Sequence, residues 1–288
     1  MSDSVVAAPE SPASAAHPIS LWKRRWLLPS LLLRPLYRLY ERRLCVAVRV
    51  NPVPRHVGII LDGNRRYAHK FGITSPRAVY DIGARKLDDV LDWCAETQVQ
   101  TVTLWVFSPE NLRRSSGEVS GILAAIETKL AALAHDVRIH DNRVRVRAIG
   151  KLSLLPAAVL TAIRAAEQAT AGYDGMALNI AVGYGGRQEI IDAVAALLRD
   201  SISPEVSLSD AIEALTPEAI GRYLYTAGFP DPDLIIRTSG EIRLSGFMLR
   251  QSAHSEFYFT DVHWPAFRKL DFLRAIRSYQ SRKRRFGR

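Results

Sequence analysis

From Arg55 onward, short apolar runs rich in β-branched residues alternate with longer stretches in which apolar residues recur at helical spacing. This alternation is typical of a parallel sheet covered by helices. The short runs predict strands at Val57–Leu61, Thr101–Phe107, Val144–Ile149, Leu178–Val182, Leu234–Arg237 and Phe257–Phe259. The longer stretches predict helices around Ala84–Thr97, Val119–Asn142, Ala157–Ala171 and Arg187–Arg199. The expected fold is α/β, a single domain with a central, mostly parallel sheet flanked by helices.

The chain before the first strand has a different composition. Residues 1–18 are rich in Ala, Ser and Pro and lack a basic segment followed by an apolar one, which predicts a disordered leader and no secretory signal. Residues 19–50 alternate leucines with arginines, and the apolar run is interrupted well short of the about 20 residues that span a bilayer. They predict a basic amphipathic helix region, which either lies at a membrane interface or packs on the domain with its arginines in water. Residues 51–288 predict one domain with a basic C-terminal segment.

The net charge of +10 lies at the two ends of the chain. Residues 1–50 hold eight Lys/Arg against three Asp/Glu, and residues 268–288 hold nine against one, so the segment between them has a net charge of −3. Because the folded middle carries no excess positive charge and no recognition motif, no nucleic-acid partner is expected. The basic ends are either solvated charge runs or contacts for phosphate or anionic headgroups. Cys45 and Cys94 match no metal-ligand spacing, which favours a reducing, cytoplasmic setting.

Polar residues follow the first predicted strand, in the run Asp62-Gly63-Asn64-Arg65-Arg66. Ligands of such sheets bind beyond the carboxyl ends of the strands. Asp62 can hold a divalent cation, Gly63 lets the backbone approach a ligand, and the helix that follows offers N–H groups to a phosphate. Asp-Gly-Asn is also ordinary turn chemistry, and both interpretations stay open on this run alone.

Arginines also follow two other strands, in the segments 107–114 and 237–245. Guanidinium groups pair bidentately with phosphate oxygens, so the second segment, with Arg237, Arg243 and Ser245, predicts a diphosphate site. A surface salt-bridge cluster is the alternative, which Arg237 disfavours because it ends an apolar run, where an unpaired charge is costly. Glu256 lies in an aromatic strand and needs a metal or an arginine as partner.

Five stretches together resemble the cis-prenyltransferase family, which includes undecaprenyl diphosphate synthase: HVGIILDGNRRYA, TLWVFSPENLRR, LNIAVGYGGR, DLIIRTSGEIRLSGF and SEFYFTDVHWP. They stand in the family's order, and the likeness covers about residues 54 to 288. The PLYRLYERRL and SGFMLRQSAHSEFYF segments resemble the short-chain branch that forms (Z,E)-farnesyl diphosphate. The phosphate loop GxxxxGKS and the DDxxD motif of trans-prenyltransferases are absent from the sequence.

The resemblance implies an Mg²⁺-dependent enzyme that condenses isopentenyl diphosphate with an allylic prenyl diphosphate, such as geranyl diphosphate, to a short-chain Z-prenyl diphosphate. A medium- or long-chain polyprenyl diphosphate synthase is the alternative, and a non-catalytic accessory subunit of the same fold is disfavoured by the presence of Asp62, Arg237 and Glu256. The ending Arg285-Phe286-Gly287 is similar to a segment that reaches the partner's active site in this family and favours a homodimer, although a disordered basic tail competes.

The family's pattern also implies roles for single residues. Asp62, Asn64, Glu110 and Asn111 match catalytic positions, and Asp62 and Glu256 match metal positions, Glu256 together with groups from the second subunit. Isopentenyl diphosphate is assigned to Arg237, Arg243 and Ser245, and the allylic diphosphate to Gly63, Asn64, Arg65, Arg66, Arg77 and Arg114.

The sequence departs from the family's common pattern at Arg65, Tyr67, Tyr80, Leu112 and Arg250. Tyr80 replaces a frequent histidine and puts a histidine role in proton handling in doubt, so the proton acceptor stays unassigned. Val106 stands where many long-chain members have alanine, and its two extra methyl groups narrow a close-packed apolar tunnel that holds the growing chain. A shorter product is therefore expected, unless Val106 merely completes a buried strand and faces away from the tunnel.

Overall fold

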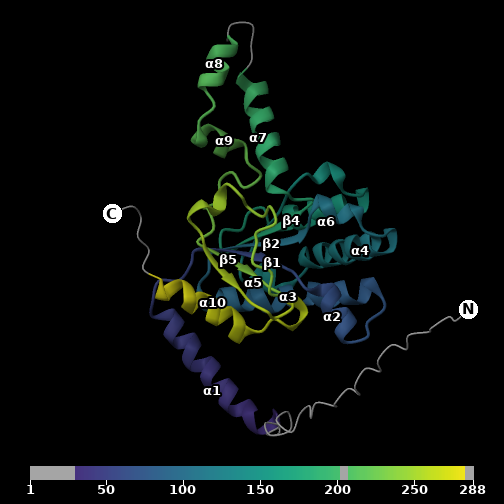
Figure 1. The fold of residues 1–288 in the computed structure, drawn as a ribbon, viewed down its shortest axis with the longest axis vertical. Helices are drawn as coiled ribbons and strands as arrows, with labels where there is room; N and C mark the ends of the chain where they lie inside the picture. Colours follow the sequence, from purple (N-terminus) through teal and green to yellow (C-terminus); the bar gives the residue numbers. More distant parts are fainter. Residues whose placement is uncertain (1–29, 202–206, 283–288) are drawn as a thin grey trace, which may run out of the picture. The chain divides into compact units, whose positions relative to one another are not determined.

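A single parallel sheet forms the centre of the fold (Figure 1). In the part of the chain that the structure describes, six strands stand in the order β3-β4-β2-β1-β5-β6, and every neighbouring pair is parallel. They are β1 (His56–Ile60), β2 (Thr101–Phe107), β3 (Arg145–Ile149), β4 (Ala177–Val182), β5 (Leu234–Arg237) and β6 (Glu256–Phe259). The predicted α/β fold with a mostly parallel sheet is confirmed, and each strand agrees with its predicted bounds to within one residue.

The structure, a computed structural model, describes residues 30–201 and 207–282 and divides the chain into two units, residues 1–40 and 41–288. The first helix, α1 (Ser30–Arg49), continues across the division. Leu44, Cys45 and Val48 in its last turns are buried in the core of the second unit. That unit therefore begins at Glu41, before the predicted boundary at residue 51. The predicted leader, residues 1–18, lies outside the described residues.

The remaining α-helices are α2 (Asn64–Lys70), α3 (Pro76–Thr97), α4 (Ser116–Leu133), α5 (Val137–Asp141), α6 (Ala157–Thr170), α7 (Gly186–Ser201), α8 (Leu208–Glu213), α9 (Pro217–Tyr223) and α10 (Lys269–Ser281). The prediction of one helix over Val119–Asn142 was wrong. Asp136 has an extended backbone, and its side chain accepts a hydrogen bond from the Arg138 N–H at 3.0 Å, so a separate helix, α5, begins there.

The predicted helix at Ala84 begins eight residues earlier, at Pro76. Ser75 caps it by accepting a hydrogen bond from the Ala78 N–H at 3.3 Å, and proline is favoured as the first helical residue. Helix α10 was not predicted from the sequence. It is amphipathic and buries Phe272 and Ile276 against the sheet.

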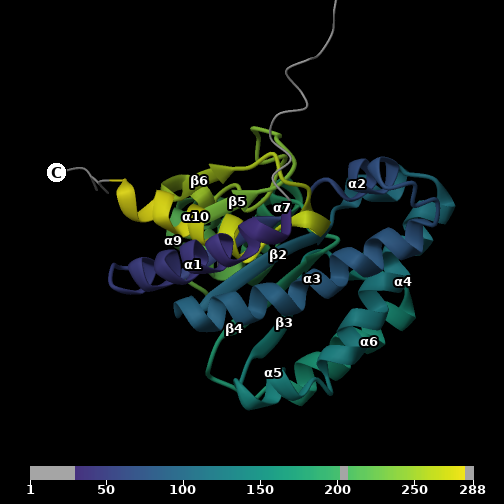
Figure 2. The same ribbon diagram turned by 90° about the horizontal axis from the view of Figure 1, so that it is seen from below.

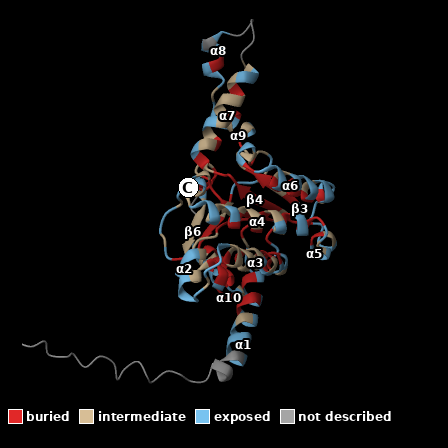
Figure 3. Cartoon of the chain, turned by 90° about the vertical axis from the view of Figure 1, so that its right-hand side faces the viewer, coloured by how far each residue is buried: buried red, intermediate tan, exposed pale blue. Residues whose placement is uncertain are grey.

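The sheet has a core on each face. Helices α10, α3, α4 and α6 contact one another in that order and cover one face, and Figure 2 shows α3, α4 and α6 side by side. Ile59 of β1 and Ile236 of β5 belong to this larger core. Their neighbours Ile60 and Ile235 point to a smaller core with Phe247 on the other face, as the two-residue period of a strand requires. In Figure 3 the buried residues lie on the strands and on the helix sides that face them.

The strand order reverses between β1 and β5. The chain passes from β1 to β2 on one side of β1 and returns on its other side with β5. In open parallel sheets the crevice at such a reversal, beyond the carboxyl ends of the strands, is where ligands bind. Asp62 follows β1 and Arg237 ends β5, so the fold brings these two residues to the reversal point.

Candidate active site

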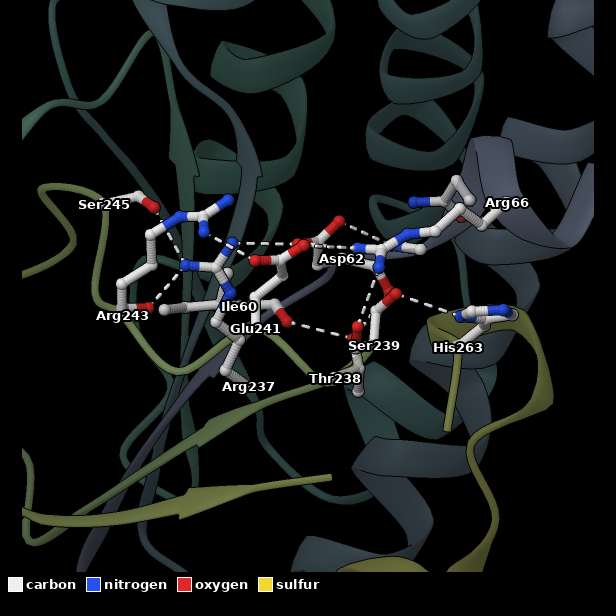
Figure 4. Close-up of polar contacts among 12 residues, drawn as sticks. Ile60, Asp62, Arg66, Arg237, Thr238, Ser239, Glu241, Arg243, Ser245 and His263 are labelled. Atoms are coloured by element: carbon white, nitrogen blue, oxygen red, sulfur yellow. Dashed lines mark hydrogen bonds and ion pairs between the residues drawn. The ribbon is translucent and has the colours of Figure 1, made fainter. Parts of the chain in front are cut away.

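Asp62 and Arg237 form an ion pair at the reversal point (Figure 4). The register pairs Ile60 with Arg237, which places Asp62 just beyond the end of β5. The Nη2 of Arg237 donates to Asp62 Oδ2 at 2.8 Å, and the Gly63 N–H donates to Asp62 Oδ1 at 2.7 Å. Burial alone raises the pKa of the Asp62 carboxyl, but the hydrogen bond and charge of Arg237, together with the Gly63 N–H and the charge of Arg66, outweigh it and lower the pKa below its usual range. Asp62 is therefore a carboxylate at neutral pH.

Arg237 also holds the loop that follows β5. Its Nη1 donates to Ser245 Oγ at 2.8 Å and to the carbonyl oxygen of Arg243. The side chain of Arg237 is only 6% exposed, whereas that of Arg243 is 62% exposed and lies 2.5 Å from Glu241 Oε2. The three residues predicted to bind isopentenyl diphosphate thus lie together: Arg237, Arg243 and Ser245. Arg237 is fixed and buried, whereas Arg243 is in contact with solvent.

Arg66 of α2 connects the two loops. Its Nη1 donates to the Ser239 carbonyl oxygen at 3.0 Å, while its Nη2 lies 3.5 Å from Asp62 Oδ2 and 3.4 Å from Glu241 Oε1 (Figure 4). Glu241 therefore partners both Arg66 and Arg243. Glu241 is not among the site residues predicted from the sequence, although a carboxylate between two phosphate-binding arginines is a usable signal.

Gly63 makes the tight turn from β1 into α2. Its φ is +101°, and a Cβ added there would lie 2.8 Å from Ser239 Oγ and 2.8 Å from His263 Nδ1. Only glycine fits without displacing the β5 loop. The next residue, Asn64, donates from Nδ2 to the Leu61 carbonyl oxygen at 3.1 Å, and its Oδ1 is buried without a partner among the described residues.

A cavity of about 760 Å³, here called the charged cavity, opens at this edge of the sheet. It collects most of the residues that the sequence predicts for the site. Those that line it are Asp62, Gly63, Asn64, Arg65, Arg66, Val106, Asn111, Arg114, Arg237, Arg243 and Ser245. Its lining in the described residues does not include Glu110, Arg77 or Glu256.

Two of these outliers have other partners. Arg77 lies on α3, where its Nε donates to Asp81 Oδ1 at 2.8 Å and its Nη2 donates to Thr128 Oγ1 of α4 at 2.9 Å. Glu256 begins β6 and is paired with Arg282.

The strand register explains the position of Glu256. It lies opposite Leu234, three residues before Arg237, and at about 3.3 Å per residue this is about 10 Å along the sheet. Within one chain, then, the structure does not bring Glu256 to Asp62 as a shared metal ligand.

Tyr80 and Arg114 line the charged cavity, and both contact Glu118. Arg114 Nη1 donates to Glu118 Oε1 at 2.7 Å and to the Tyr80 hydroxyl at 3.1 Å, and that hydroxyl donates to Glu118 at 2.9 Å. Burial and the Glu118 carboxylate raise the pKa of Tyr80 to about 12. Tyr80 therefore keeps its proton at neutral pH.

A second cavity of about 80 Å³, here called the narrow cavity, continues from the charged cavity between the sheet and helices α3 and α4. Its walls are mostly apolar. Both cavities are lined by Leu61, Asn64, Tyr80, Val106 and Ile122. Val106 therefore faces this space, and the alternative that it points away from it does not hold.

Comparison with known proteins identifies the class. The family model described as putative undecaprenyl diphosphate synthase matches residues 60–287. An isoprenyl transferase of Thermus thermophilus is 55% identical over 257 residues, covering 89% of this chain and 97% of the relative. A (2Z,6E)-farnesyl diphosphate synthase of Thermobifida fusca is 52% identical over 257 residues, covering 89% and 99%.

A tritrans,polycis-undecaprenyl-diphosphate synthase of Pyrococcus horikoshii is 46% identical over 261 residues, covering 91% of this chain and 97% of the relative. The crystal structure of lavandulyl diphosphate synthase from Lavandula x intermedia, in complex with dimethylallyl diphosphate, superposes with a TM-score of 0.72 at 32% identity. That superposition covers 82% of this chain and 99% of the plant enzyme. The chain therefore belongs to the undecaprenyl diphosphate synthase family and is a cis-prenyltransferase, as the five motifs predict.

Proposed function

We propose that this enzyme adds isopentenyl diphosphate to an allylic primer, geranyl diphosphate, and stops at a short-chain Z-prenyl diphosphate such as (Z,E)-farnesyl diphosphate. The observation that carries the proposal is the size of the narrow cavity. Its volume of about 80 Å³ leaves little room for a long apolar chain beyond the charged cavity. A long polyprenyl tail would have to displace close-packed walls. The relative from Thermobifida fusca supports a short product, and the one from Pyrococcus horikoshii names the long-chain alternative.

The isopentenyl diphosphate group is assigned to Arg237, Arg243 and Ser245. Arg237 is already oriented by Asp62, so its guanidinium needs little reorganisation to bind phosphate. Arg243 is exposed and can exchange Glu241 for a diphosphate at small cost, because an exposed ion pair contributes little.

The allylic diphosphate is assigned to the β1–α2 turn, with the backbone of Gly63 and the side chains of Asn64, Arg65, Arg66 and Arg114. All of these line the charged cavity. Arg77 takes part only if it leaves Asp81 and Thr128, which makes it the weakest member of this set.

Asp62 is the proposed Mg²⁺ ligand. Mg²⁺ is usually bound by one or two carboxylates together with substrate phosphates and water, and an ionised Asp62 beside a diphosphate site fits that donor set. When bound, the ion neutralises the diphosphate charge and helps the diphosphate to leave. Glu256 remains a proposed metal ligand only across a homodimer, since within one chain it lies at the other end of the strands.

In the proposed reaction, the C–O bond between the allylic carbon and its diphosphate breaks, and the double bond of isopentenyl diphosphate attacks that carbon. A proton is then lost from the isopentenyl-derived unit to the departing diphosphate or to a polar group of the site, which forms the new double bond. Arg66 and Arg114 stabilise the departing diphosphate. Asn111 lines the charged cavity and is held by the hydrogen bond from the Ser108 N–H to its Oδ1, at 3.0 Å. Asn64 and Glu110 are the other residues assigned near the reacting carbons.

Membrane contact, cytoplasmic location and a homodimer are further parts of the proposal. None of the described helices combines the length and apolar character that a bilayer span requires. Leu36, Tyr37 and Leu39 of α1 are exposed, with Arg38 between them in the sequence, as in an interfacial helix. Cosedimentation with anionic phospholipid vesicles tests the contact, and sedimentation equilibrium tests the dimer. The Arg285-Phe286-Gly287 ending lies outside the described residues.

The proposed function is tested by product analysis. The enzyme is incubated with geranyl diphosphate, labelled isopentenyl diphosphate and Mg²⁺, and the products are separated by chromatography after removal of the diphosphate. We expect one condensation to predominate. An undecaprenyl-length main product would contradict the short-chain assignment and leave the family assignment standing.

A further inference from the structure

One charged side chain reaches the narrow cavity away from the charged cavity. Among the described residues that line only the narrow cavity, Lys129 of α4 is the one that carries a charge. The others there, such as Leu87, Leu104 and Ile126, are apolar or small. An apolar pocket for a prenyl tail gains nothing from a lysine, so its position calls for an explanation.

Lys129 lies at the deep end of this cavity. Both α3 and α4 begin at the carboxyl edge of the sheet and run toward the amino edge, because each follows a loop at that edge. Tyr80 and Ile122 line both cavities, and Leu87 and Lys129 each come seven residues later on the same helices. Seven residues correspond to a depth of about 10 Å at about 1.5 Å per residue.

That depth matches a short chain. A peptide unit spans three bonds in about 3.8 Å, so a four-bond isoprene unit spans about 5 Å when extended. A depth of about 10 Å therefore equals the extended length of about two isoprene units, counted below the unit that carries the diphosphate. The total is three units, the length of farnesyl diphosphate.

An ion-pair cluster fixes Lys129 in place. Its Nζ donates to Asp88 Oδ1 of α3 at 2.5 Å, and Asp88 also lies 2.8 Å from Arg138 Nη2. The side chains of Lys129 and Asp88 are 16% and 21% exposed. The lysine stem therefore lies along the apolar space while its ammonium reaches a carboxylate near the surface.

A separate hollow of about 530 Å³ lies at the amino edge of the sheet, and Arg138 and Asp136 contribute to its lining. Asp88 contacts Lys129, which lines the narrow cavity, and Arg138, which lines the hollow. The ion-pair cluster of Lys129, Asp88 and Arg138 therefore links a lining residue of the narrow cavity to a lining residue of the hollow.

We propose that Lys129, held by Asp88, is the floor of the product tunnel and helps to set the length at which elongation stops. A tail that reached Lys129 would have to displace its stem and weaken a partly desolvated ion pair, and an alkyl group offers the ammonium nothing in return. Val106 narrows the upper part of the same space, so the two residues act at different depths. The inference rests on the proposed prenyl-elongating function.

The test compares Lys129→Ala with Lys86→Ala. Lys86 is a matched control: its Nζ lies 2.6 Å from Asp89 Oδ2, its side chain is 18% exposed, and it does not line the narrow cavity. Each purified variant is incubated with geranyl diphosphate, Mg²⁺ and excess labelled isopentenyl diphosphate, and product lengths are resolved by chromatography. For Lys129→Ala we expect the ratio of longer products to the wild-type product to rise by about tenfold or more. Lys86→Ala should keep the wild-type distribution.

The possible outcomes distinguish the proposed role of Lys129 as the tunnel floor from the proposed prenyltransferase function. A folded, active Lys129→Ala enzyme with the wild-type distribution would overturn the floor, as would equal lengthening by Lys86→Ala. If circular dichroism shows that Lys129→Ala does not fold, Asp88→Ala decides: it removes the acceptor of the ammonium, and lengthening supports the floor while an unchanged distribution overturns it. Absence of any prenyl product from the wild type would instead refute the proposed function.

Discussion

Replacing Asp62 with asparagine removes the carboxylate charge and keeps an oxygen that can accept the Arg237 hydrogen bond. We expect turnover to fall by at least about 100-fold, because the site loses the group that places the metal and the diphosphate. The structure adds a second effect: Asp62 is also the counterion of Arg237, whose side chain is 6% exposed. The substitution should therefore lower the stability of the folded protein as well as its turnover.

The stability effect can be bounded. Removing one partner of a fully buried ion pair costs about 3–5 kcal/mol. The side chain of Asp62 is 30% exposed, and asparagine retains a hydrogen bond, so we expect about 1–2 kcal/mol. At about 2–4 °C per kcal/mol for a chain of this size, Tm should fall by about 2–8 °C. Asp62→Ala should lower Tm further, because Arg237 and the Gly63 N–H both lose their acceptor.

The pH dependence has a defined sign. The folded-state pKa of Asp62 is lowered, so its contribution to stability is present above the usual carboxyl range and is lost as the pH falls through the folded pKa. The Tm difference between wild type and Asp62→Asn should therefore shrink on acidification below about pH 4. Steady-state kinetics and thermal melts over pH measure both effects. Retention of more than about a tenth of wild-type turnover would contradict the metal-placing role, and an unchanged Tm would contradict the counterion role.

Three further results are expected. Arg243→Ala should raise KM for isopentenyl diphosphate far more than KM for the allylic primer and leave Tm nearly unchanged. Arg237→Ala should have the same effect on KM and should also lower Tm. Equal effects on both substrates would refute separate diphosphate sites. Val106→Ala should lengthen the products in the chromatographic assay, and an unchanged distribution would show that the upper wall does not limit growth. Burial lowers the pKa of His56 in the folded protein to about 4. On acidification the histidine is therefore protonated in the unfolded chain before it is protonated in the folded protein. The free energy of unfolding should fall by about 3 kcal/mol between pH 6.5 and 4. Urea titrations of wild type and His56→Gln measure this loss, which the variant should lack.

The main elements of the fold follow from local patterns. The strands are apolar runs, half-buried in β6 and mostly buried elsewhere, and the parallel arrangement explains why Asp62 and Arg237, far apart in sequence, meet at one edge. The break at Asp136 was missed because apolar periodicity continues across it, while a single side-chain cap decides where the backbone turns.

Site residues were harder to place when their partners come from other elements. Arg77 has Asp81 four residues on, which the sequence shows, but its second partner, Thr128, belongs to α4. Glu256 is the first residue of its strand whereas Asp62 follows the end of one, and in a parallel sheet those ends are opposite edges. The separation of Glu256 from Asp62 could therefore be inferred from their positions relative to the predicted strands, although motif matching alone did not reveal it. Lys129 could not be found from sequence, since a lysine on a helix is ordinarily solvated.

The most direct test of the central claim is the identity of the first elongation product. Wild-type enzyme is incubated with geranyl diphosphate, labelled isopentenyl diphosphate and Mg²⁺, and the product is examined by chromatography and by NMR of the new double bond. The account predicts a product one isoprene unit longer than the primer, with the new double bond in the Z configuration. A new double bond in the E configuration, or no incorporation of label with any allylic primer, would contradict it.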